Sequence, residues 1–254
     1  MSDPYSQARS IPGRADMAVD AGLRKFMLGV YNKMGLGLIW SAALAYAVGA
    51  YLPLTQLVLG TPLLYVVQWG PIVLLLGSNF LMRNPSPTSS GLLYWSVVTL
   101  IGAGLGVWVF LAVSGLQGQT VGGGSLHVSF EGIGKAFLMT AIAFGGLSLW
   151  GYTTKRDLSP IGSFLIFTTW GMVGVAALNL FVFKSDMLQL GMQFVSLAVF
   201  GLLIAFQTQA LKFSYYALQG DSRSMAVMTN FGALNLYIAF IAIFQALLSL
   251  FSRR

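Results

Sequence analysis

Hydrophobic residues form seven long runs along the chain, separated by short polar segments. A run of about 20 apolar residues crosses a bilayer as a helix, because a helix satisfies its own backbone N–H and C=O groups. The pattern therefore predicts an all-α fold, a polytopic transmembrane helical bundle of seven helices. We place the spans at residues 27–52, 63–82, 91–114, 131–152, 160–183, 187–213 and 226–250.

Composition supports a membrane protein. Hydrophobic residues make up 56% of the 254 residues and charged residues only 8%, whereas a soluble domain has about 25% charged residues. We expect two regions, a cytoplasmic N-terminal tail at 1–25 and a seven-helix transmembrane domain at 26–252. The tail is polar and has no apolar core, so it does not resemble a cleavable signal peptide.

Basic residues predict how the chain is oriented. With seven spans and the N-terminus inside, the cytoplasmic side receives ten Lys and Arg residues and the opposite side four, as the positive-inside rule requires. We expect an inner-membrane location, a cytoplasmic N-terminus and a periplasmic loop around His127. This bias also accounts for the net charge of +7. Nucleic acid is not an expected partner, because no basic stripe with interleaved aromatic residues lies outside the spans.

Catalytic chemistry has few candidate residues in this chain. His127 is the only histidine and there is no cysteine, so a zinc site or a catalytic triad lacks its other members. The glycines at 122–124 lack the Gly-Lys-Ser/Thr ending of a phosphate loop and are more typical of a linker. We expect no enzyme activity, no cofactor and no metal site.

Polar residues inside the spans are neutral amides and hydroxyls. Interhelical hydrogen bonds explain most of them without transport. Gln207 is the most suggestive, since an amide oxygen can coordinate a cation weakly but cannot titrate. Gly102 and Gly106 form a small-xxx-small pair that predicts close helix contact.

Three stretches carry a family resemblance that covers about residues 20–250. They are 145–159 (Gly-Gly-Leu-Ser-Leu-Trp-Gly-Tyr-Thr-Thr-Lys-Arg-Asp-Leu-Ser), 29–34 (Gly-Val-Tyr-Asn-Lys-Met) and 232–237 (Gly-Ala-Leu-Asn-Leu-Tyr). They closely resemble Bax inhibitor-1-like (YccA-type) integral membrane proteins, especially an alphaproteobacterial branch. The resemblance implies seven helices with the last one central and enclosed by the others. It also implies a pH-sensitive calcium leak in some members, and association with the membrane protease FtsH in some bacterial members.

The family's leak is ascribed to two aspartates that share a proton, one in a Tyr-Asp-Thr-Gln motif and one in a Tyr-Leu-Asp-Phe motif. This chain departs from both motifs. It has Phe206-Gln207-Thr208-Gln209 in the first, and Tyr237-Ile238-Ala239-Phe240 in the second. Two close carboxylates titrate near neutral pH because they cannot both ionise cheaply. With Gln207 and Ala239 no shared proton remains, so we do not transfer the calcium site to this chain.

Two functions remain as hypotheses. The first is a Bax inhibitor-1-like protein without the di-aspartyl calcium and pH sensor, which acts as an accessory or regulatory partner of another membrane complex, for example by modulating an FtsH-type protease. The alternative is a pH-insensitive calcium or cation leak through the bundle. In that alternative the pore would be lined by Gln207, Gln209 and Asn235.

Overall fold

The computed structural model describes residues 21–81, 84–114, 120–121, 124–125 and 127–252. The tail at 1–20, the glycines at 122 and 123 and the basic residues Arg83, Arg253 and Arg254 therefore lie outside the described residues. Helices α1 (Ala21–Ala50), α4 (Pro87–Ser114), α5 (Phe130–Thr153), α6 (Ser159–Leu178), α7 (Asp186–Ala217) and α8 (Ser222–Ser252) are each long and apolar enough to cross a membrane.

A seventh candidate span is a bent pair of helices. Helices α2 (Leu52–Leu59) and α3 (Leu63–Leu81) meet at an angle of 65° and together pass as one span. The hydrophobic pattern predicts only a connection between the spans 27–52 and 63–82, but residues 52–59 of this connection are helical. Pro53 in the first turn of α2 is compatible with a helix start, because that position needs no backbone N–H donor. The prediction of an all-helical membrane bundle is confirmed.

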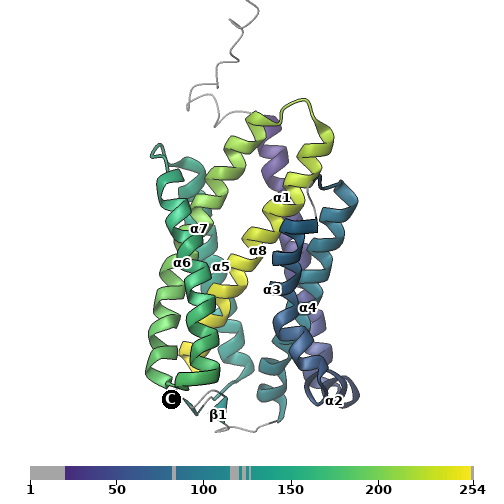
Figure 1. The fold of residues 1–254 in the computed structure, drawn as a ribbon, viewed down its shortest axis with the longest axis vertical. Helices are drawn as coiled ribbons and strands as arrows, with labels where there is room; N and C mark the ends of the chain where they lie inside the picture. Colours follow the sequence, from purple (N-terminus) through teal and green to yellow (C-terminus); the bar gives the residue numbers. More distant parts are fainter. Residues whose placement is uncertain (1–20, 82–83, 115–119, 122–123, 126, 253–254) are drawn as a thin grey trace, which may run out of the picture.

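Helix α8 is the centre of the bundle. Of its most apolar stretch 61% is buried, against 6–33% in the other single-helix spans. Figure 1 shows α8 crossing diagonally between a group that contains α5, α6 and α7 and a group that contains α1, α3 and α4. Leu236 and Tyr237 of α8 are completely buried in the main hydrophobic core. The central last helix that the family resemblance implied is confirmed.

Glycines allow α1 and α4 to approach closely. A Cβ placed on Gly102 would lie 2.8 Å from the Cα of Ser41, and one on Gly106 would lie 2.7 Å from Val48. Any side chain at Gly102 would therefore push the two backbones apart. The close contact predicted from these glycines is confirmed, and its partner is α1.

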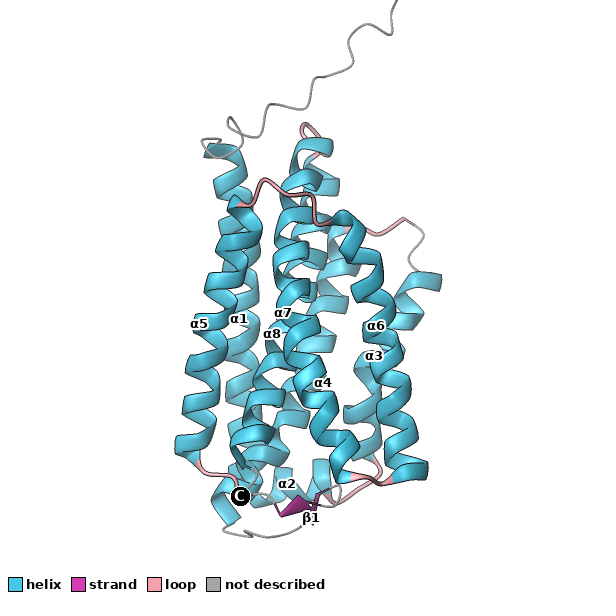
Figure 2. Cartoon of the chain, turned by 90° about the vertical axis from the view of Figure 1, so that its left-hand side faces the viewer, coloured by secondary structure: helices cyan, strands magenta, loops and turns pink. Residues whose placement is uncertain are grey.

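The connections lie at two ends of the bundle. Figures 1 and 2 show the start of α1 and the α7–α8 turn at one end, with α2, β1 (Thr120–Val121) and the end of α8 at the other. Strand β1 pairs antiparallel with β2 (Gly124–Ser125). Between α6 and α7 the chain forms a π-helical turn, η2 (Asn179–Phe183), and Lys184 takes a left-handed conformation.

Side chains accept hydrogen bonds from the free backbone N–H groups at the starts of several helices. Ser129 and Ser185 accept hydrogen bonds from the backbone N–H groups of Gly132 and Leu188 at the starts of α5 and α7. Asp221 accepts hydrogen bonds from Ser224 and from the backbone of Arg223 at the start of α8. These hydrogen bonds lower the pKa of Asp221, and the bond from the Ser224 side chain has the largest effect.

Candidate functional site

The two positions that correspond to the family aspartates are both inside the bundle. Gln207 is half-buried on α7, and its side-chain oxygen is buried without a hydrogen-bond partner among the described residues. Ala239 is 1% exposed in the core of α8. The structure thus presents an unpaired amide oxygen at one position and a methyl group at the other.

Gln209 bonds to the loop between α5 and α6, a contact that the sequence did not predict. Its side-chain oxygen accepts a hydrogen bond of 2.8 Å from the backbone N–H of Leu158, and its amide nitrogen donates to the Arg156 carbonyl at 2.7 Å. Both polar atoms of this amide therefore hold the loop between α5 and α6 against α7. The residues at 207 and 209 are about 200° apart around the helix, so they face different surroundings.

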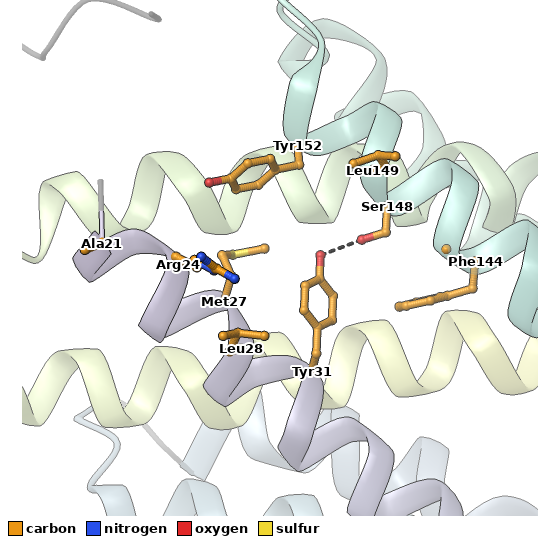
Figure 3. A pocket seen from close by; sticks show the side chains of 10 residues that line it. Ala21, Arg24, Met27, Leu28, Tyr31, Phe144, Ser148, Leu149 and Tyr152 are labelled. Carbon is orange, nitrogen blue, oxygen red and sulfur yellow. Dashed lines mark hydrogen bonds between the residues drawn. The ribbon is translucent and has the colours of Figure 1, made fainter. Parts of the chain in front are cut away.

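Thr208 begins a chain of hydroxyl groups that leads from α7 to α1. Its hydroxyl lies 3.2 Å from that of Ser148 on α5, which in turn lies 2.5 Å from the Tyr31 hydroxyl on α1. Figure 3 shows the Tyr31 hydroxyl directed at Ser148. Sequence reasoning did not identify Tyr31 or Ser148, although both lie in the stretches that carry the family resemblance.

Tyr31 and Ser148 line a cavity of about 810 Å³ between α1 and α5, which we call the α1–α5 groove. Figure 3 shows Arg24 and Tyr152 toward the Ala21 end of the groove and Phe144 at the other end. The lining residues are Ala21, Arg24, Met27, Leu28, Tyr31, Phe144, Gly145, Ser148, Leu149 and Tyr152.

Two lysines, one on α1 and one on α7, bring positive charge into the bundle. Lys33 of α1 donates a hydrogen bond to the side-chain oxygen of Asn230 on α8, and lies 5.2 Å from the centre of the Tyr94 ring. Lys212 of α7 is 7% exposed, donates to the Tyr152 carbonyl at 3.0 Å and lies over the Tyr152 ring. Cations held in this way disfavour a second cation nearby.

Asn230 joins three helices. In addition to its contact with Lys33, its amide nitrogen donates to the Pro87 carbonyl at 3.0 Å and to the Ser90 hydroxyl at 2.8 Å. Farther along α8, the Tyr237 hydroxyl lies 2.6 Å from that of Ser41 on α1. These bonds fix α8 against α1 and α4 with neutral acceptors only.

Asn235, the third residue of the predicted pore lining, is exposed on α8. Ala242 and Gln245 follow it along the same helix. Those two residues line a second cavity of about 870 Å³, bounded mainly by α6, α7 and α8. Several amides, among them Asn179, Gln189 and Gln193, also line this cavity.

Metal-binding chemistry is sparse in the described part of the chain. No group of three or more His, Asp and Glu side chains comes together there. His127 is exposed, and its backbone N–H donates to the Ser252 carbonyl, near the end of α8. Gln207 itself offers only an amide oxygen, which binds a divalent cation weakly without carboxylates beside it.

The architecture and the site define a polytopic α-helical membrane protein with an enclosed central helix that has no charged residue from Met225 to Ser252. The sequence matches the family described as "Inhibitor of apoptosis-promoting Bax1" over residues 23–254, and the chain belongs to this Bax inhibitor-1 family. It is 50% identical to a protein of Caulobacter vibrioides, over 96% of this chain and 95% of that protein. It is 31% identical to the inner membrane protein YbhL of Escherichia coli, over 95% and 97% of the two chains, and 29% identical to the protein RP147 of Rickettsia prowazekii, over 92% of each.

Proposed function

We propose that this protein is an inner-membrane member of the Bax inhibitor-1 family that lacks the di-aspartyl calcium and pH sensor. It acts as an accessory or regulatory partner of another membrane complex, for example a membrane protease of the FtsH type. One observation carries the proposal: an amide and a methyl group, at Gln207 and Ala239, occupy the two positions that correspond to the family aspartates.

Electrostatics supports the loss of the sensor. A shared proton requires two carboxylates whose mutual repulsion raises one pKa, and neither Gln207 nor Ala239 can titrate. Calcium is bound by six to eight oxygens, usually with carboxylates among them. Lys33 and the buried Lys212 instead add positive charge to the bundle, which disfavours a bound cation. An intact scaffold without the charged site supports a binding role over conduction.

The proposed orientation places the N-terminus and the α7–α8 turn in the cytoplasm and His127 in the periplasm. The excess of Lys and Arg at the first end supports this orientation. The name of YbhL as an inner membrane protein supports the proposed location.

Helix α6 offers the contact face for the partner. It is the least buried span, with 6% of its apolar stretch inside the structure. Phe167, Gly171, Gly174 and Leu178 recur on its exposed side. A Cβ at either glycine would meet no atom within 4 Å, so a partner helix could approach the backbone there, as at small-residue interfaces in membranes.

Purification of the tagged protein from its own membranes in a mild detergent tests the accessory role. We expect a stoichiometric membrane-protein partner, which a Gly171→Leu/Gly174→Leu variant loses while it keeps the wild-type thermal stability. The control is Gly191→Leu on α7, because Gly191 also faces open space. Recovery of only a monomer or self-oligomer would contradict the accessory role.

The alternative function is a pH-insensitive cation leak. It is favoured by the unpaired side-chain oxygen of Gln207, which could face a passing ion. Flux through liposomes separates the two functions, because a calcium or potassium leak that Gln207→Leu abolishes would support the alternative.

A further inference from the structure

We propose that the α1–α5 groove binds one anionic phospholipid, with the lipid phosphate at Arg24 and an acyl chain along the apolar wall. The groove combines a cation at one end with a surface of Met27, Leu28, Phe144 and Leu149. Its volume of about 810 Å³ lies in the range of pockets that hold small molecules.

The depth of Arg24 suits a lipid headgroup. Helix α1 has 30 residues, so it is about 45 Å long at 1.5 Å per residue. The hydrocarbon core of a bilayer is only about 30 Å thick, which places the first turns of α1 at the level of the headgroups. Arg24 is the fourth residue of α1, and the groove runs from it toward the bilayer interior at Phe144.

The Arg24 guanidinium is available for an anion. Within the described part of the chain no carboxylate pairs with it, and the one ion pair there joins Lys135 to Glu131 at 2.5 Å. A guanidinium presents a fork of N–H donors that matches a phosphate. Tyr152 lies toward the same end of the groove.

The remaining wall favours a lipid over a soluble phosphate. Leu28 is 50% and Leu149 64% exposed, so the lips of the groove present hydrocarbon to the bilayer. Gly145 leaves the wall open, since a Cβ there would meet no atom within 4 Å. These open, apolar positions leave room along the wall for an acyl chain.

Native mass spectrometry of the full chain with phosphatidylglycerol or phosphatidylcholine tests this proposal. We expect one retained phosphatidylglycerol per chain and no comparable retention of phosphatidylcholine. Arg24→Gln should weaken retention about tenfold, as loss of a charge-assisted hydrogen bond does. Its control is Lys25→Gln, which removes the same charge from an exposed neighbour outside the groove. Gly145→Leu should also weaken retention, whereas Gly146→Leu, with equal open space outside the groove, should not.

Thermal unfolding of each variant in detergent confirms that it is folded. Equal losses in Arg24→Gln and Lys25→Gln would assign the effect to general surface charge and overturn the proposal. So would equal retention of the two lipids, or displacement of the lipid by soluble glycerol phosphate at similar concentration. If the protein is a dimer and Gly145→Leu dissociates it, the groove is an interface with a second copy of the chain and the lipid proposal is wrong.

Discussion

Two glutamines on one turn of α7 have opposite surroundings. The side-chain oxygen of Gln207 is buried without a partner, whereas both polar atoms of the Gln209 amide bond to the α5–α6 loop. A buried polar atom without a partner has lost its hydration and gained nothing in return. Gln207 therefore stabilises the fold little, and Gln209 stabilises it substantially.

Leucine at each position makes this difference measurable. Gln209→Leu should lower the free energy of unfolding by about 2 kcal/mol, because it leaves the Leu158 N–H and the Arg156 carbonyl unpaired. Gln207→Leu should leave stability unchanged within about 0.5 kcal/mol or raise it. Thermal unfolding in one detergent, with each variant as the other's control, provides the comparison. Equal destabilisation by both would show that Gln207 also has a partner in the folded protein.

Sequence reasoning could foresee only part of this residue-level picture. The comparison of motifs identified 207 and 239 as the altered positions, because the departures are visible in the letters themselves. Gln209 bonds to Leu158 and Arg156, which lie 51 and 53 positions earlier in the chain. This pairing depends on how the α5–α6 loop folds back. The contact of Tyr31 with Ser148 spans 117 positions, and no local pattern reports such a pairing.

At the scale of elements, the contact between α1 and α4 depends on glycine. Gly102 lies against the backbone of Ser41, and Ser41 bonds both to the Val98 carbonyl and to the Tyr237 hydroxyl. The close approach of α1 and α4 therefore also positions the central helix.

Gly102→Ala should destabilise the protein by about 1–3 kcal/mol, because its Cβ meets backbone atoms that cannot rotate away. Gly35→Ala on α1 should instead be neutral or stabilise by about 0.5–1 kcal/mol, since nothing lies within 4 Å and alanine favours a helix. Thermal unfolding measures both. No destabilisation by Gly102→Ala would mean that α1 and α4 are farther apart than the structure has them.

The spans could be predicted well, and the interruptions could not. Hydrophobic runs locate helices because the bilayer sets their length. The break between α2 and α3 is less visible, because 52–62 is uncharged and its helix lacks the length of a span. The extension of α7 to Ala217 was not predicted either. Lys212 indicated a span end near 213, but in the structure this lysine is buried and donates to the Tyr152 carbonyl of α5.

At the scale of the whole molecule, the bundle encloses a central helix without a charged residue from Met225 to Ser252. Its cross-helix bonds run through amides and hydroxyls at Asn230, Tyr237 and Ser249. Such a helix can be held firmly while having no carboxylate or histidine that could exchange a proton near neutral pH. The chain keeps the helical bundle and has no carboxylate at 207 or 239, which is the basis of the proposed loss of the sensor.

Calcium flux into liposomes at acidic and alkaline pH tests this claim most directly. We predict that the wild-type protein gives the flux of protein-free vesicles at every pH, because neither Gln207 nor Ala239 can bind a proton or serve as a carboxylate ligand. A Gln207→Asp/Ala239→Asp variant measured in parallel shows whether an acid-sensitive path can be restored in the same scaffold. A wild-type calcium flux that changes with pH would contradict the account.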